Sequence, residues 1–309
     1  MINVAERKYR KICVLKGGDS PEREVSLVSA TNYMRALDEL GYVYGDFDFS
    51  GNAEQLISYI RRESPDCVLN ALHGGSGENG NIQALMNLLK VPYTHSGVMA
   101  SSVAMDKRAS REAFAKNGLR VPTGFTTFWN EFRECPAMEY PFVIKPVDGG
   151  SSVHVRIIRD QKALSSIDWQ YKNGEILVEE YIPGLELTVG VLDDRPLEVT
   201  NLIVPSGFLD YDSKYSVGRS LHEIPAKISP KVRDEVLETA MKAHKIIGCR
   251  GVSRSDFRYN DKTEELYILE LNTQPGMTPF SFVPEQAEFV GIPFAQLVQW
   301  IIEKACYDT

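Results

Sequence analysis

Two short runs in the last fifth of the chain place oxygen-bearing and basic side chains at alternate positions. Glu270 and Asn272 close an apolar segment that reads as a strand, and Arg254 and Asp256 show the same spacing upstream. Strand side chains alternate between two faces, so the members of each pair point to one side. The polar stretch 260–265 predicts a turn. The runs therefore form a hairpin with Asp256 opposite Glu270 and Arg254 opposite Asn272.

Such a hairpin brings two carboxylates and an amide oxygen together beside an arginine. Hard oxygen ligands of this kind suit Mg²⁺, which binds a few carboxylates together with substrate phosphates. Alternating charge is also typical of a solvated face, and Arg254 and Asp256 taken alone fit that interpretation. Glu270 and Asn272 end an apolar strand before a Pro-Gly turn, where scaffolds present site residues. The four together predict a magnesium site and phosphoryl chemistry.

A glycine-serine loop, KPVDGGSSV at 145–153, joins two predicted strands and begins with Lys145. Glycines let the backbone bend so that successive N–H groups cradle phosphate oxygens, and the lysine adds a positive charge. No helix follows the loop, so it is neither a P-loop nor a Rossmann fingerprint. A Gly-Gly turn on its own is commonly structural. Beside a magnesium hairpin, a phosphate lid is favoured.

Two further polar loops follow predicted strands near the N-terminus. In 17–26, Ser20 is a natural helix N-cap with Pro21 at the first helical position, and Glu22 follows. Glu22 either complements the helix dipole or holds a substrate ammonium, because open α/β sheets bind ligands at this edge. His73 opens the loop 73–80 at the same edge. It is either a structural histidine or part of that site.

Composition bounds the class of protein. The 309 residues suffice for two or three domains, and 43% hydrophobic with 25% charged residues is ordinary for a globular protein. A net charge of −8 without a basic block argues against nucleic acid as a partner. No apolar run reaches about twenty residues, which argues against a membrane span, and residues 1–11 lack a signal-peptide core. We expect a cytoplasmic protein with five free thiols, at Cys13, Cys67, Cys135, Cys249 and Cys306.

Three segments follow from the order of predicted elements: 1–98, an open parallel α/β domain; 99–181, an α+β domain; and 182–309, a second α+β domain. The expected strands are 12–15, 67–70, 142–145, 153–158, 176–179, 186–192 and 201–204, besides the hairpin. The expected helices are 22–40, 82–89, 107–117, 230–247 and 294–305.

These motifs, in this order, resemble those of the ATP-grasp superfamily and, within it, the D-alanine–D-alanine ligases. The resemblance covers almost the whole chain. It rests on GGDSPEREVSL (17–27), LHGGSGENG (72–80), PYTHSGVMASSVAMDK (92–107), KPVDGGSSV (145–153), VEEYIPGLELTV (178–189), DYDSKY (210–215), GVSRSDF (251–257) and ELNTQPGMTPFSFVPE (270–285). It implies an ATP-grasp fold in which 99–181 is the lid domain and 182–309 carries the metal and catalytic residues, with ATP sandwiched between these two domains.

The resemblance also implies roles for individual residues. ATP would be bound by Lys107, Lys145, Ser151, Ser152, Glu179, Glu180, Tyr181, Ile182, Glu186 and Lys214. Two Mg²⁺ ions, replaceable by Mn²⁺, would be held by Asp256, Glu270 and Asn272. The first D-alanine would meet Glu22, with Ser151 and Tyr215 beside it, and His73 would line the substrate site. Arg254 and the Gly276 N–H would stabilise the oxyanion, and Ser281 and Phe282 would line the second subsite.

The implied reaction joins two D-alanines through an acyl phosphate, with release of ADP and phosphate, and serves peptidoglycan synthesis. The resemblance further implies a homodimer. His154 departs from the family pattern, which generally has glycine there; we expect it to stiffen the lid or to alter its closure. Two alternatives stay open: a related ligase that uses D-serine or D-lactate as acceptor, and an ATP-binding module without catalysis.

Overall fold

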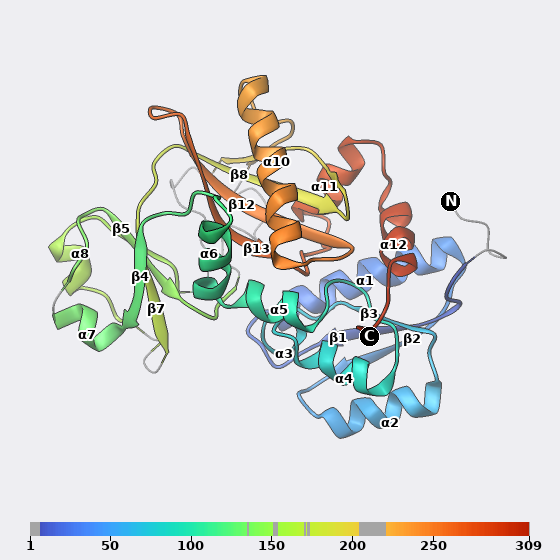
Figure 1. Ribbon diagram of the computed structural model, residues 1–309. Coiled ribbons are helices and arrows are strands. Elements are labelled where there is room, and N and C mark those ends of the chain that lie inside the picture. Colours follow the sequence, from blue (N-terminus) through green and yellow to red (C-terminus); the bar gives the residue numbers. More distant parts are fainter. Residues whose placement is uncertain are drawn as a thin grey trace.

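The computed structural model describes residues 7–134, 136–150, 154–169, 171, 174–203 and 221–308. Figure 1 shows three sheets that follow one another along the chain, each with its own helices. Among the described residues no helix is long and apolar enough to cross a membrane. The predicted domain boundaries at 98 and 181 stay predictions.

The first sheet is parallel, in the order β2-β1-β3. Its strands and the helices around it are β1 (Lys11–Gly17), β2 (Val43–Phe49), β3 (Cys67–Asn70), α1 (Arg23–Leu40), α2 (Ala53–Glu63), α3 (Gly75–Glu78), α4 (Asn81–Leu89) and α5 (Val98–Met105). The predicted open parallel sheet is thereby confirmed.

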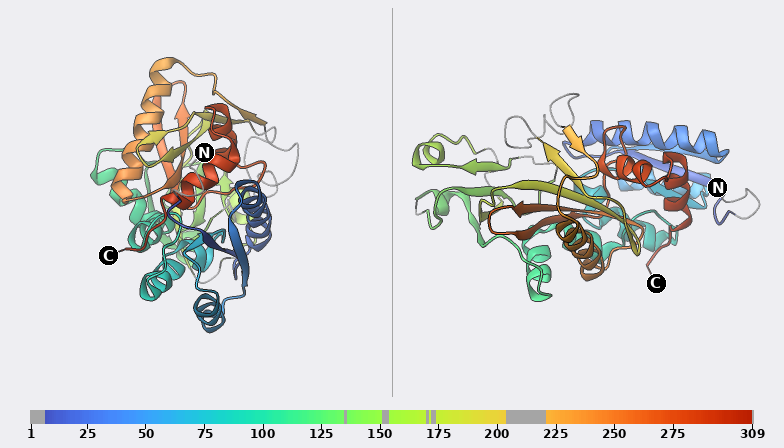
Figure 2. Two further views of the ribbon diagram at one scale, coloured as in Figure 1. Left: turned by 90° about the vertical axis from the view of Figure 1, so that its right-hand side faces the viewer. Right: turned by 90° about the horizontal axis from the view of Figure 1, so that it is seen from above.

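Helices cover both faces of this sheet, which explains why β1 is apolar at every central position. Ile12 and Val14 pack on one side with α1 and with α12 (Phe294–Glu303), the last helix of the chain. Cys13 and Leu15 pack on the other side with α2 and α4. The C-terminal helix thus lies against the first sheet, as Figures 1 and 2 show.

The second sheet is antiparallel, in the order β4-β7-β5-β6. It consists of β4 (Gly124–Phe128), β5 (Phe142–Pro146), β6 (Arg156–Ile158) and β7 (Glu175–Glu180), after helix α6 (Lys107–Lys116) and with α7 (Trp129–Glu134) and α8 (Gln161–Ser165). A core rich in aromatic side chains holds it together, with Trp129 stacked on Trp169 at 5.3 Å between ring centroids. In Figure 2 this lobe lies at the end of the molecule opposite the N-terminus.

The third sheet is antiparallel, in the order β11-β10-β8-β12-β13, and β9 pairs with β8. Its elements are β8 (Leu185–Leu192), β9 (Arg195–Pro196), β10 (Thr200–Ile203), β11 (Leu221–Glu223), β12 (Val252–Asn260), β13 (Glu265–Asn272), α10 (Pro230–Ile247) and α11 (Phe282–Phe289). Helix α10 packs its apolar stripe on β8, β12 and β13.

The predicted hairpin is confirmed in its register: Asp256 pairs with Glu270, and Arg254 with Asn272. One irregularity interrupts it, because the next pair is Phe257 with Ile268 and Leu269 is left over as a bulge. Alternation would otherwise place Glu270 on the face of the buried Ile268. The bulge shifts the phase, so Glu270 and Asn272 share the open face.

Two local predictions are wrong, and a third is confirmed only in part. Ser20 does not cap α1: the helix begins at Arg23 with Glu22 as N-cap, because the Ser20 hydroxyl donates to the His73 carbonyl and accepts from the Glu22 N–H. The loop 73–80 contains the short helix α3. The strand expected at 153–158 is described only as β6, from Arg156.

Candidate active site

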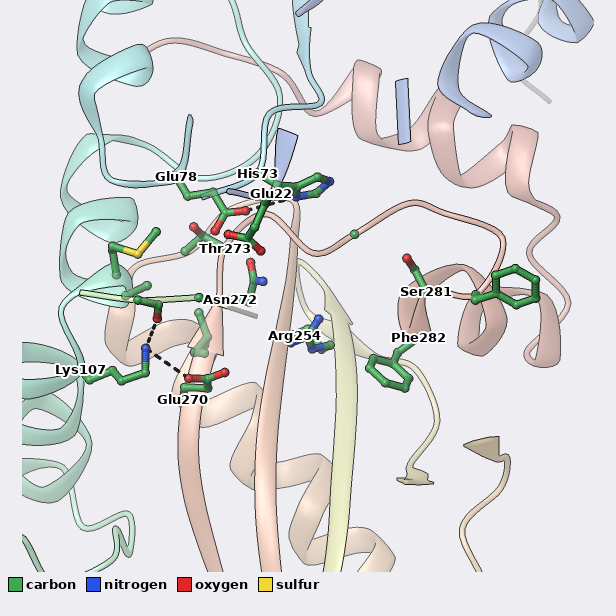
Figure 3. A pocket seen from close by; sticks show the side chains of 17 residues that line it. Glu22, His73, Glu78, Lys107, Arg254, Glu270, Asn272, Thr273, Ser281 and Phe282 are labelled. Carbon is green, nitrogen blue, oxygen red and sulfur yellow. Dashed lines mark hydrogen bonds and ion pairs between the residues drawn. The ribbon is translucent and has the colours of Figure 1, made fainter. Parts of the chain in front are cut away.

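A pocket opens where the first and third sheets meet beside the glycine loop after β5 (Figure 3). Seventeen residues from separate parts of the chain line it. The predicted site residues that line it are Glu22, His73, Lys107, Arg254, Glu270, Asn272, Gly276, Ser281 and Phe282. Residues from distant parts of the chain thus face one space.

Cationic side chains already accompany the hairpin carboxylates. Arg254 forms a two-pronged ion pair with Asp256, with Nε–Oδ1 at 2.9 Å and Nη2–Oδ2 at 2.7 Å. Lys107 Nζ lies 3.5 Å from Glu270 Oε2 and donates to the Gly149 carbonyl of the glycine loop. Both carboxylates thus have cationic partners, in positions that the hairpin register and the bulge at Leu269 set.

Glu22 projects into the pocket from the N-terminal end of α1 and is only 8% exposed. Two glycines make room for its carboxylate. A Cβ atom at Gly74 would lie 2.3 Å from Glu22 Oε2, and one at Gly150 would lie 3.1 Å from the same oxygen. Gly150 belongs to the loop after β5, so that loop reaches across to the first sheet and covers Glu22.

His73 is buried at the end of the segment after β3 and has a polar partner on each ring nitrogen. Nε2 lies 3.0 Å from Ser29 Oγ, and Nδ1 lies 3.3 Å from Glu78 Oε1. Behind it lies His95, whose pKa is lowered to about 3 by burial and, to a smaller extent, by His73. His73 is thus anchored by two hydrogen bonds and also lines the pocket, and its role in substrate binding stays a prediction.

The loop after β13 supplies the far wall of the pocket, where Ser281 and Phe282 lie in Figure 3. Gly276 approaches it closely, since a Cβ there would stand 2.9 Å from Ser281 Oγ. Ser281 is the N-cap of α11, but its hydroxyl bonds to Thr278 and not to the helix. Phe282 lies under Arg254, with the guanidinium carbon 5.5 Å from the ring centroid.

Lys145 stands in β5, outside the pocket wall, in a buried three-residue cluster. Its ammonium pairs with Glu179 of β7, and Arg111 of α6 pairs with the other oxygen of the same carboxylate at 2.8 Å. Glu179 is 2% exposed. One carboxylate between two cations leaves the cluster with a net positive charge, which suits an anionic ligand.

Comparison with known proteins identifies the family. Residues 127–303 match the family model described as D-ala D-ala ligase C-terminus. A D-alanine–D-alanine ligase of Granulibacter bethesdensis is 46% identical over 302 residues, which cover 96% of this chain and 98% of the relative. The chain belongs to the D-alanine–D-alanine ligase family.

Solved structures agree with this family assignment. The D-alanine–D-alanine ligase of Bacillus anthracis superposes with a TM-score of 0.83 at 30% identity, over 96% of this chain and 97% of that one. Its complex with ATP gives 0.81 at 28% identity, with the same coverage. A D-Ala:D-Ser ligase of Enterococcus faecalis gives 0.78 at 26% identity, over 96% and 99%. The predicted ATP-grasp fold and the ATP-dependent ligase class are confirmed.

The remaining residues that family resemblance assigns to ATP lie at the end of β7 and the start of β8. The Glu180 and Tyr181 N–H groups already donate to the carbonyls of Thr123 (2.9 Å) and Pro141 (3.3 Å). The Ile182 carbonyl accepts from Arg258 Nε at 2.9 Å, and Glu186 pairs with the same arginine at 3.3 Å. Those two N–H groups are therefore used within the protein.

Four predicted residues lie outside the described residues: Ser151, Ser152, Lys214 and Tyr215. Conversely, three charged residues that hold predicted site residues were not predicted from the sequence. Glu78 holds His73, Arg111 holds Glu179, and Arg258 holds Glu186. Spacing contained a signal for two of them, because Arg258 continues the alternation of Arg254 and Asp256, and Arg111 lies one helical turn after Lys107.

Proposed function

We propose that this site activates one D-alanine with ATP as an acyl phosphate and joins it to the amine of a second D-alanine. The observation that carries this proposal is the meeting of Glu22 with Lys107, Arg254, Glu270 and Asn272 around one pocket. A carboxylate suited to an ammonium group thus faces the groups suited to phosphate and oxyanion. Condensation of two amino acids requires both.

Each side of the pocket has a defined task in this scheme. Glu22 binds the ammonium of the first D-alanine and fixes its carboxylate towards Lys107. Lys107 and Lys145 neutralise phosphate oxygens, and Arg254 together with the Gly276 N–H stabilises the tetrahedral oxyanion. Donors placed in advance in this way are worth about 10²–10³ in rate each. Ser281, at the N-terminus of α11, receives the carboxylate of the second D-alanine.

Magnesium fits the donor set of the hairpin. Asp256, Glu270 and Asn272 offer hard oxygens on one face, and Glu270 is 27% exposed, within reach of a nucleotide. Two Mg²⁺ ions, or Mn²⁺ in their place, would supply neutralisation of the phosphate charge when bound. Among the described residues, Asn272 Oδ1 accepts one hydrogen bond, from the Gln274 N–H at 2.8 Å, and a second lone pair would serve the metal.

ADP release measured with D-alanine, L-alanine, D-serine and D-lactate, each as the acceptor in the presence of D-alanine as donor, tests the proposal. We expect D-alanine to be the acceptor that supports dipeptide formation at the highest kcat/KM. Faster turnover with D-serine would instead place the chain with the Enterococcus faecalis enzyme, a D-Ala:D-Ser ligase. Tight binding of ATP and Mg²⁺ without turnover of any acceptor would indicate a binding module.

We further propose a cytoplasmic homodimer. Support for an interface on the N-terminal part comes from two large apolar side chains on neighbouring helices, Leu88 of α4 (82% exposed) and Met99 of α5 (74% exposed). Sedimentation velocity of the purified protein distinguishes one copy from two. Replacing Leu88 and Met99 by Glu should shift the protein to the monomer, and an unchanged sedimentation coefficient would place any interface elsewhere.

A further inference from the structure

One side chain of the loop after β13 crosses to the first sheet. Gln274 is 1% exposed and places its amide between Asn70 and Leu72, at the end of β3. Its Oε1 accepts from Asn70 Nδ2 at 2.8 Å, and its Nε2 donates to the Leu72 carbonyl. Leu72 is the neighbour of His73, so this contact ties the loop to the wall that carries the first-substrate residues.

The backbone of the same residue holds the predicted metal ligand. The Gln274 N–H donates to Asn272 Oδ1 at 2.8 Å. Figure 3 shows Asn272 between the group formed by Glu22, His73 and Glu78 and the group formed by Lys107 and Glu270. Through its side chain and its N–H, Gln274 therefore connects these two sides of the pocket directly.

The amide network around Gln274 has a single consistent orientation. The Leu72 carbonyl can only accept, so the NH₂ of Gln274 must face it and its oxygen must face Asn70. Asn70 Nδ2 also donates to the Gly77 carbonyl at 3.1 Å, and Asn70 Oδ1 accepts from the Leu72 N–H at 3.2 Å. A buried network with its partners satisfied is rigid and costly to break.

A second tie supports the same loop. Asn32 Nδ2 of α1 donates to the Met277 carbonyl at 3.0 Å, and the Met277 N–H donates to Ser29 Oγ at 3.4 Å. Ser29 is also the partner of His73. Gly276, the predicted oxyanion donor, lies between the Gln274 and Met277 attachments. Its N–H is therefore held at a set distance from the first-substrate wall.

We propose that Gln274 is a positioning residue that keeps the activated first substrate aligned with the oxyanion donors and the incoming amine. The proposal rests on the proposed function. In a variant that lacks the Gln274 hydrogen bonds, the loop no longer keeps this alignment, and water reaches the acyl phosphate. Water then adds across the acyl–phosphate bond and returns the D-alanine carboxylate and inorganic phosphate with release of a proton. ADP accumulates without dipeptide.

The test compares Gln274→Met with Gln83→Met. Methionine keeps the length of glutamine and removes its hydrogen bonds. Gln83 is a matched control, because it is also 1% exposed and donates to the Gly77 carbonyl at 2.8 Å, and this hydrogen bond stays beside the first sheet and does not reach the loop after β13. ADP and D-alanyl-D-alanine are quantified in the same reaction. Gln274→Ser, which leaves a smaller side chain, serves if the methionine variant fails to fold.

We expect about one ADP per dipeptide in the wild-type protein and in Gln83→Met. In the Gln274 variants we expect at least two ADP per dipeptide, rising as D-alanine is lowered, with KM for ATP within about twofold of wild type. A ratio of one in a folded Gln274 variant, whatever its kcat, overturns the proposal, as does an equal leak in Gln83→Met. Failure of the wild-type protein to form any dipeptide would instead contradict the proposed function.

Discussion

His95 gives a prediction about stability that can be worked out quantitatively. The imidazole is 4% exposed behind the wall that carries His73, and its pKa is lowered to about 3 from an ordinary value of 6.5. Burial is the main cause, and His73 adds to it. Neither ring nitrogen makes a hydrogen bond of normal geometry within the described part of the chain, and the approach of the Asn70 backbone offsets only part of the burial effect.

The sign of the pH effect follows from proton uptake. Because the folded-state pKa is depressed, the unfolded chain binds more protons than the folded one between about pH 3 and pH 6.5. The contribution of His95 is fully present above the unfolded value and is lost as pH falls. Between pH 7.5 and pH 5 the wild-type free energy of unfolding should fall by about 2 kcal/mol from this residue alone.

The assay is urea unfolding of the wild-type protein, His95→Asn and His95→Gly at both pH values. The backbone φ at position 95 is +71°, a conformation that asparagine and glycine accept. The two variants differ in cavity and backbone strain, so their absolute stabilities differ. Neither titrates, so both should gain about 2 kcal/mol relative to wild type on acidification.

The comparison cancels every other titrating group, since those are common to the three proteins. A stability difference that stays constant with pH in both variants would refute the reasoning that His95 is held neutral by burial. A shift in only one variant would mean that the effect comes from altered packing and not from the imidazole.

Three further predictions concern the site. Glu179→Gln removes the shared counter-charge of Lys145 and Arg111 and should lower stability by about 3 kcal/mol and raise KM for ATP; an unchanged melting temperature would contradict it. Glu270→Gln should raise the Mg²⁺ needed for half-maximal rate roughly tenfold or more, with little effect on Kd for D-alanine, and an unaltered Mg²⁺ titration would exclude Glu270 as a ligand. His154→Gly should change KM for ATP, because His154 has φ +60° and lies against Trp169 and Tyr171 (6.3 and 6.4 Å between ring centroids); identical kinetics would retire a role in the lid.

The hairpin shows what period-two spacing can and cannot predict. The pairing of Asp256 with Glu270 followed from alternate polar positions on both sides of a polar turn. The bulge at Leu269 could not be predicted in this way, because an additional leucine in an apolar strand does not reveal a bulge in a single sequence. Yet without it Glu270 would face the core. The sequence thus predicted the right partners, while the phase of the strand that presents them came only from the structure.

Contacts between distant segments could not be predicted from the sequence either, and the reason is a different one. Asn70 and Gln274 are uncharged, belong to no chemical motif and stand far apart along the chain, so nothing in the residues pairs them. Ser20 failed as a helix cap because a tertiary partner, the His73 carbonyl, takes its hydroxyl. Sequence signals predicted the structure correctly where no distant segment competes for the residue. One example is Gly41, which ends α1 in the left-handed conformation.

The ion pairs of the site bear on how substrates enter it. Glu270 is paired with Lys107, and Asp256 with Arg254, so each of these partly buried carboxylates has a cationic partner. In the proposed function, a nucleotide that arrives with Mg²⁺ would exchange these partners and would create little new buried charge. Arg254 would then share Asp256 with a cation and would have N–H donors for an oxyanion, and Lys107 would contact the phosphates.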